Sequence, residues 1–290
     1  MSEPIQKPLA TDNHEEKLKI YFLPNLLTAG NLFCGFVALT KIVDANLTPD
    51  LITGKVNWMP IQLSLAFILL ACIFDLFDGR VARMGGVESP FGREFDSLAD
   101  LISFGVAPAF LVQRVVLAHV FPPEYHRLSW FIASIYLLCG AFRLARFNCL
   151  AAMNLPGAGK DFLGFPIPSA AGLVASMTLL IIHVNENEKN LGLWNYFIAF
   201  VLLFLSAMMV STVKYPSFKS LGLRAQNTFV KAIIAALFVG CILILQQKIL
   251  YYVLPAFFTL YLIYGFVRPS LSRAWRREIE EEDDESEVEK

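Results

Sequence analysis

Four aspartates stand at helical spacing where two apolar stretches of the sequence meet polar residues. Asp75 and Asp78 end one apolar run, and Asp96 and Asp100 begin the next. Residues three or four apart share one face of a helix, so each pair is expected to present both carboxylates on the same side. Carboxylates held close together need cations to stay ionised, and ligand sets made only of oxygen suit Mg²⁺, Mn²⁺ or Ca²⁺ rather than zinc. The four residues therefore predict a divalent-metal site.

The residues between the two pairs predict a hairpin with room for a bulky anion. Gly85, Gly86, Pro90 and Gly92 interrupt the helical pattern, so two antiparallel helices joined here would bring the four carboxylates together. A solvated loop with ordinary interfacial charges is the alternative. The acids continue in helical register into apolar sequence, which favours a functional site. Small side chains would let an anion approach the backbone, and a nearby arginine could meet its phosphates. These residues are Gly79, Ala82, Gly92 and Arg83.

The elements that carry these residues are predicted to be membrane-spanning helices. The chain is 56% hydrophobic and only 17% charged, and its mean hydropathy is +0.55, whereas soluble domains are about a quarter charged. A large soluble core of buried helices is the weaker alternative. About 20 residues at 1.5 Å rise cross the roughly 30 Å apolar core of a bilayer. We therefore predict an all-α polytopic membrane protein, a bundle of about eight transmembrane helices at 22–43, 61–83, 96–120, 129–149, 165–184, 195–213, 229–246 and 249–267.

Basic residues orient this bundle and set its boundaries. With eight spans, three quarters of the 24 Lys and Arg residues fall on one side, which predicts cytoplasmic termini and an aspartate site at the cytoplasmic ends of helices 2 and 3. The predicted organisation is an N-terminal cytoplasmic tail (1–20), a transmembrane domain (21–268) and an acidic cytoplasmic tail (269–290), which is expected to be disordered because its residues 278–290 are acidic and include no aromatic residue.

The aspartate stretch resembles the signature of the CDP-alcohol phosphatidyltransferase family. The pattern D-x2-D-G-x2-A-R-x8-G-x3-D-x3-D is met without departure by Asp75, Asp78, Gly79, Ala82, Arg83, Gly92, Asp96 and Asp100. The resemblance implies an enzyme that transfers the phosphatidyl group of CDP-diacylglycerol to an alcohol and releases CMP, with two divalent ions, Mg²⁺ or Mn²⁺. It further implies a homodimer in a bacterial inner membrane. No nucleic-acid partner is expected.

The same resemblance assigns roles to individual residues. Asp75, Asp78 and Asp96 are expected to bind metal, and Asp100 to bind metal and also act as general base, although a ligand role alone fits its spacing equally well. Thr28 and Asn31 are either nucleotide-binding residues or polar packing residues of a membrane bundle. The small residues and Arg83 named above are expected to contact CDP-diacylglycerol.

The resemblance also implies that the acceptor alcohol is L-serine. Arg143 and Arg146, three residues apart, could bind its carboxylate or the diphosphate, or they could be interfacial anchors. Glycerol 3-phosphate, inositol phosphate and choline are alternative acceptors, although a phosphorylated one would call for a denser basic pocket. A cation transporter is the rival from another class, but transporters would be expected to spread their acids over several helices near the midplane. A weaker candidate patch comprises Lys214, Tyr215, Ser217 and Lys219.

Overall fold

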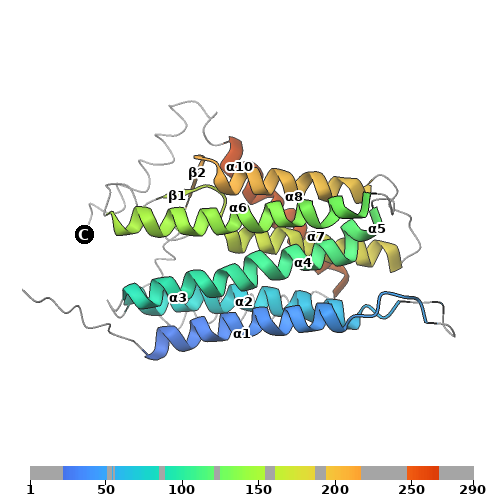
Figure 1. Cartoon of the computed structure of the whole chain (residues 1–290), viewed down its shortest axis with the longest axis horizontal. Helices are drawn as coiled ribbons and strands as arrows, with labels where there is room; N and C mark the ends of the chain where they lie inside the picture. The colour runs from blue at the N-terminus through green and yellow to red at the C-terminus, as the bar shows by residue number, and fades with distance from the viewer. Residues whose placement is uncertain are drawn as a thin grey trace, which may run out of the picture.

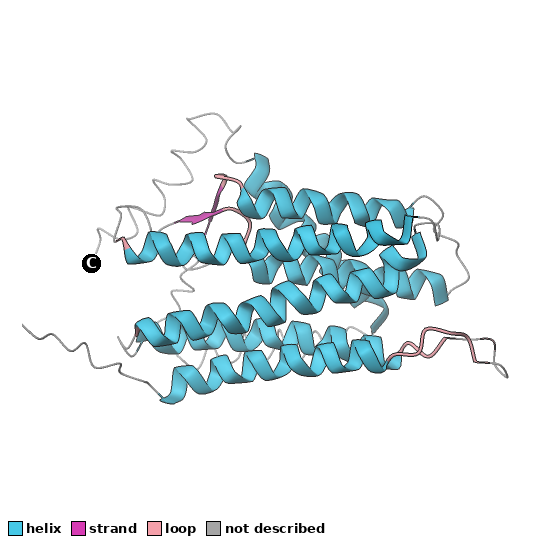
Figure 2. Cartoon of the chain, viewed as in Figure 1, coloured by secondary structure: helices cyan, strands magenta, loops and turns pink. Residues whose placement is uncertain are grey.

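The structure is a bundle of long helices with one small two-stranded sheet at its side (Figures 1 and 2). It is a computed structural model that describes residues 22–50, 54, 56–84, 89–120, 125–153, 161–186, 194–216 and 247–267. The predicted tails, 1–20 and 269–290, and the predicted span 229–246 lie outside these residues.

Helices α1 and α2 form a long antiparallel pair that carries the first half of the site. They comprise Phe22–Asp44 and Met59–Met84, and they pack along each other (Figure 1). The carboxyl end of α1 is closed by Arg114, whose guanidinium donates to the carbonyl oxygens of Val43 and Ala45. This contact satisfies carbonyls that the helix itself cannot pair.

The third long helix contains two π-helical segments between its α-helical parts. Its parts are α3 (Pro90–Asp100), the π-helical segment η1 (Leu101–Val106), α4 (Ala107–Val112), a second π-helical segment η2 (Gln113–Leu117) and α5 (Ala118–Val120). The predicted start at residue 96 is wrong by six residues. Ser89 caps the helix by accepting a hydrogen bond from the Gly92 amide at 3.0 Å, and Pro90 occupies the first helical position, where its missing N–H costs nothing.

The second half of the chain supplies the helices that face this group. They are α6 (His126–Ala152), α7 (Ile167–Glu186), α8 (Trp194–Val210) and α10 (Gln247–Val267). Strands β1 (Asp161–Leu163) and β2 (Lys214–Pro216) pair antiparallel, with Phe162 opposite Tyr215. The sequence did not predict this sheet.

Within the described residues, five helices are long and apolar enough to cross a membrane: Phe22–Asp44, Met59–Gly79, Pro90–Leu117, Arg127–Ala152 and Ile167–Val184. They confirm the first five predicted spans to within a few residues, apart from the start of the third. Two shorter apolar helices, Tyr196–Val210 and Tyr251–Tyr264, lie within the predicted spans 195–213 and 249–267. Large apolar side chains such as Phe33 and Phe36 are more than half exposed on the outside of the bundle, as expected for contact with lipid. The chain is thus a polytopic helical membrane protein.

Candidate active site

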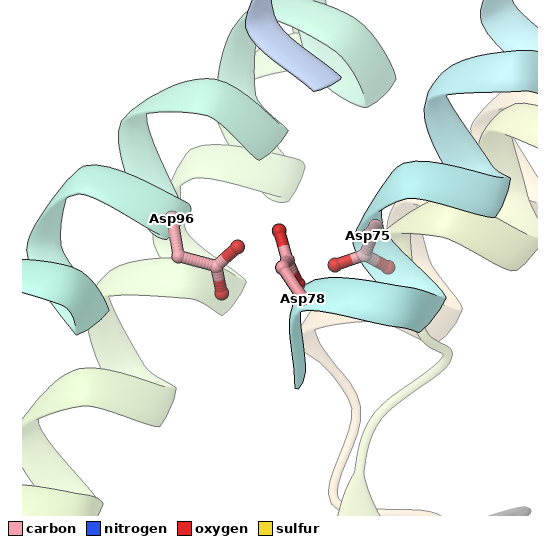
Figure 3. Close-up of side chains that lie close together, drawn as sticks. All are labelled: Asp75, Asp78 and Asp96. Atoms are coloured by element: carbon pink, nitrogen blue, oxygen red, sulfur yellow. The ribbon is translucent and has the colours of Figure 1, made fainter. Parts of the chain in front are cut away.

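Three carboxylates meet where the end of α2 faces the start of α3. Asp75 and Asp78 come from the last turns of α2 and Asp96 from α3, and their side chains point toward one another (Figure 3). One oxygen of each lies within 4.8 Å of the others. The spacing of three on α2 is what brings Asp75 and Asp78 to the same face.

This cluster suits a divalent cation. Two unit charges about 5 Å apart repel by about 3 kcal/mol at an effective dielectric constant of about 20, so three carboxylates together are costly unless a cation joins them. Oδ1 of Asp96 is buried and has no hydrogen-bond partner, which leaves an oxygen ready to bind a metal. An oxygen-only set of this kind fits Mg²⁺ or Mn²⁺. The three residues can hold a metal ion.

Helix α1 holds one acid from each of the two facing helices. Thr28 Oγ1 donates to Asp78 Oδ2 at 3.0 Å, and Asn31 Nδ2 donates to Asp100 Oδ1 at 3.0 Å. All four side chains are buried. The sequence left open whether Thr28 and Asn31 bind a nucleotide or pack the bundle; in the structure both orient carboxylates.

The third helix approaches α1 closely at this point. Ser103 Oγ, in η1, donates to the backbone carbonyl of Asn31 at 2.9 Å. A β-carbon at Gly35 would collide with Ser103, so only glycine permits this approach. The contact fixes Asn31 from its backbone side and keeps its amide facing Asp100.

Asp100 lies apart from the three-carboxylate cluster. It ends α3, is 7% exposed, and is not in the group whose oxygens can share one ion. It remains within electrostatic range of all three other aspartates. The predicted roles of Asp100, as metal ligand and as base, therefore stay predictions.

The small residues of the predicted site follow the acids along α2 and α3. Gly79 and Ala82 lie in α2 after Asp78. The structure does not describe the side chains of Ala82 and Arg83. At Gly92, in the first turn of α3, a β-carbon would lie 3.3 Å from Asn25 Oδ1 and 3.2 Å from Ser89 Oγ. Gly92 therefore brings α1 and α3 together, and its predicted contact with the lipid nucleotide stays a prediction.

Two residues of this end of the bundle were not singled out from the sequence. Asn25, one turn before Thr28, has a buried Nδ2 without a hydrogen-bond partner, so it offers a donor where α1 packs on Gly92. Asn148, near the end of α6, exchanges hydrogen bonds with Ser97 at 3.0 and 3.3 Å and donates to Glu94 at 3.2 Å. It thereby holds α3 on both sides of Asp96. An asparagine in an apolar helix was the available signal for both.

Arg146 holds the backbone of the small sheet. Its guanidinium donates to four carbonyl oxygens, those of Leu163 (3.0 Å), Met209 (3.3 Å), Val210 (2.7 Å) and Ser211 (3.0 Å). These groups belong to β1 and to the end of α8, where helix carbonyls lack partners of their own. The guanidinium predicted to bind acceptor or phosphate is therefore engaged with main-chain oxygens, and its substrate role stays a prediction.

Arg143 is the basic residue of α6 that lies toward the acids. It is 7% exposed, and it is close enough to Asp100, Asp75 and Tyr261 to interact electrostatically with each. Tyr215, from the weaker candidate patch, is fully buried, and burial together with nearby Tyr261 raises the pKa of its hydroxyl. Tyr215 is therefore a packing residue that stays protonated, rather than an exposed anchor.

These features define a helical membrane protein with a carboxylate cluster that can hold a metal ion at one end of its bundle. The comparison with protein families names the class more closely: residues 21–213 match the CDP-alcohol phosphatidyltransferase family. The chain belongs to that family, as the resemblance of the aspartate stretch predicted.

The names of three similar proteins agree with this family. A CDP-diacylglycerol–serine O-phosphatidyltransferase of Helicobacter pylori is 32% identical over 86% of this chain and 91% of its own length. A protein of the same name from Bacillus subtilis is 33% identical over 68% of this chain and 92% of its own length. An archaetidylserine synthase of Methanothermobacter thermautotrophicus is 32% identical over 69% of this chain and 72% of its own length.

Proposed function

We propose that this protein transfers the phosphatidyl group of CDP-diacylglycerol to the hydroxyl of L-serine, giving phosphatidylserine and CMP. The observation that carries the proposal is the cluster of Asp75, Asp78 and Asp96, which occupies the signature positions of the family. The relatives described above are named for transfer to serine or for making a serine lipid. This agreement favours serine over glycerol 3-phosphate, inositol phosphate or choline.

The aspartates of the site have separate roles in the proposed reaction. Divalent ions bound to the aspartates, Mg²⁺ or Mn²⁺ and two in number by analogy with the family, would neutralise the diphosphate and the charge of the departing phosphate. The serine oxygen attacks the lipid-side phosphorus, the bond from that phosphorus to the bridging oxygen breaks, and CMP leaves with the bridging oxygen. Asp100 takes the proton of the serine hydroxyl. Its burial and its bond to Asn31 support this role, because both hold the carboxylate in one place.

The remaining predicted contacts complete the site. Gly79, Ala82 and Gly92 leave room for the nucleotide diphosphate, and Arg83 meets its phosphates. Thr28 and Asn31 act through Asp78 and Asp100, which their hydrogen bonds support. Arg143 is the better candidate for the serine carboxylate, because it is buried and interacts electrostatically with Asp100 and Asp75, whereas Arg146 holds main-chain oxygens of β1 and α8.

The proposed setting is a homodimer in a bacterial inner membrane. The transmembrane domain, 21–268, would cross the membrane eight times, with both tails and the aspartates in the cytoplasm. The distribution of Lys and Arg supports this orientation, and a cytoplasmic site would give direct access to serine and a route of release for CMP.

The test is CMP release by the purified protein in detergent micelles containing CDP-diacylglycerol. Serine and each alternative acceptor are supplied separately, with Mg²⁺, with Mn²⁺ or with a chelator. We expect release with serine and a metal, and phosphatidylserine on a lipid chromatogram. Product formed only from another alcohol would refute the serine assignment, and unchanged release with the chelator would refute the metal site.

A further inference from the structure

The last described helix, α10, reaches the active-site side of the bundle although it lies beyond residues 21–213 of the family match. It packs along α7 and contacts β2 (Figure 1). The ring of Phe258 occupies the space where a β-carbon at Gly172 would lie. One end of α10 is held by Tyr251, which stacks on His183 with ring centroids 4.2 Å apart.

Tyr261 lies in the second half of α10, in an aromatic cluster with Phe165 and Tyr215. Its ring centroid is 5.6 Å from that of Phe165 and 5.8 Å from that of Tyr215. Phe165 and Tyr215 pack edge to face at 5.2 Å, and the Tyr215 hydroxyl donates to the carbonyl oxygen of Leu262 at 3.4 Å. These contacts fix the ring of Tyr261, since aromatic pairs at such distances favour particular orientations.

The same tyrosine lies within electrostatic range of Arg143. Arg143 is buried and interacts electrostatically with Tyr261 and also with Asp100 and Asp75. Arg146, one turn further along α6, holds the Leu163 carbonyl two residues before Phe165. The backbone held by Arg146 therefore leads into the aromatic cluster that fixes Tyr261 within electrostatic range of Arg143.

We propose that Tyr261 is a specificity-determining residue that recognises, together with Arg143, the carboxylate of an amino-acid acceptor. A guanidinium offers parallel N–H donors to a carboxylate, and the phenol adds an O–H donor to the same group. In serine the hydroxyl and the carboxylate are separated by two carbon atoms, so a carboxylate bound at Arg143 keeps the hydroxyl near Asp100. The inference rests on the proposed function, because it assumes that serine is the acceptor.

The decisive variant is Tyr261→Phe, which removes the hydroxyl and retains the ring that packs on Phe165 and Tyr215. The matched control is Tyr264→Phe on the same helix, where the side chain is 43% exposed. We expect Tyr261→Phe to raise the KM for serine at least about tenfold, the effect of one hydrogen bond to a charged group. The KM for CDP-diacylglycerol and kcat should stay within about twofold of wild type, and Tyr264→Phe should match wild type throughout.

An acceptor without a carboxylate separates recognition from general damage. With serinol, which keeps the amino and hydroxyl groups of serine, Tyr261→Phe and wild type should be equally poor. A serine KM equal to that of Tyr264→Phe would overturn the inference, and so would a parallel loss of CDP-diacylglycerol binding, which would make Tyr261 structural. Wild-type protein that uses only another alcohol would refute the proposed function itself, whereas wild type that uses serine with an unaffected Tyr261→Phe would refute only this inference.

Discussion

The side-chain amide of Asn31 donates a hydrogen bond to Asp100 over 3.0 Å and so joins α1 to the buried end of α3. Thr28, one turn earlier on α1, makes the equivalent bond to Asp78 at the end of α2. One face of α1 thus orients an acid on each of the two helices that build the site. Helix α1 contributes no carboxylate to the site, but its hydrogen bonds position Asp78 and Asp100.

Replacing Asn31 with leucine should therefore impair chemistry more than substrate binding. The change removes the donor to Asp100 at nearly constant volume, and a lost hydrogen bond to a charged group is worth about 1.5–3 kcal/mol. We expect kcat for CMP release to fall about ten- to a hundredfold, with a smaller change in the KM for CDP-diacylglycerol. Thr40→Val is the control, since Thr40 lies on the same helix, and its hydroxyl donates to the Phe36 carbonyl one turn earlier in that helix. A variant that keeps half the wild-type kcat would show that Asn31 does not position Asp100.

The metal cluster should be visible in stability as well as in activity. Asp96→Asn removes one of three adjacent negative charges, so the metal-free variant should unfold about 2–6 °C above metal-free wild type. Added Mn²⁺ should raise the unfolding temperature of wild type and have much less effect on the variant, whose turnover should be abolished.

Asp44→Asn is the control for this experiment. Asp44 is exposed at the far end of α1 and pairs with Lys41 at 3.6 Å, so its removal should leave the response to Mn²⁺ unchanged. If Mn²⁺ stabilised Asp96→Asn as strongly as wild type, the ion would be bound elsewhere.

The acid cluster could be predicted because helical geometry fixes it. The spacing of three on α2 brings Asp75 and Asp78 to one face, and the surrounding apolar runs predict that both stretches are helices. The spacing of four on α3 does not bring Asp100 into the three-carboxylate cluster with Asp96. The predicted start of the third span is wrong because Gly85, Gly86, Pro90 and Gly92 together resemble one long break in the helical pattern. In the structure Pro90 begins the helix and Ser89 caps it.

Other features depend on contacts that cannot be inferred from the types of the residues involved. The partners of Arg146 are main-chain carbonyls, which every residue possesses, so nothing in the sequence marks Met209 or Ser211 as its partners. The strands β1 and β2 are three residues each, too short to show alternation. Tyr261 acquires its neighbours only when α10 packs beside β2, a long-range contact.

Arg146→Lys should destabilise the protein. An ammonium group cannot reproduce the planar fork that reaches four carbonyl oxygens, and partly buried carbonyls left without donors cost about 1–3 kcal/mol each. We expect the unfolding temperature to fall by several degrees, measured by a thermal scan in detergent. Arg127→Lys, at the exposed opposite end of α6, should have little effect. Equal stability of the two variants, with a raised serine KM for Arg146→Lys alone, would assign Arg146 to the substrate.

Reporter fusions should test the orientation. Fusions after residues 90 and 160 are expected to report the cytoplasm, and fusions after residues 50 and 190 the opposite side, because the Lys and Arg residues are concentrated on the first of these sides. A fusion after residue 90 that reports the opposite side would place the aspartates away from cytoplasmic serine. A fusion after residue 247 tests whether 229–246 and 249–267 form a spanning pair.

The π-helical segment η1 begins directly after Asp100 and ends before Ala107. A π-helical turn takes up about one residue more than an α-helical turn, and one residue of an α-helix rotates the chain by about 100°. If the same six residues Leu101–Val106 were wound as regular α-helix, Asp96 and Asp100 would rotate by about 100° relative to α4. The acids would then face away from α2 although every residue of the signature remained. Deleting one of the six residues as the segment became α-helical would leave the acids facing α2, because the lost residue offsets the tighter winding. The π winding between Asp100 and Ala107 therefore sets the direction of the acids, and a one-residue deletion there should be tolerated better than a substitution that rewinds all six residues as α-helix.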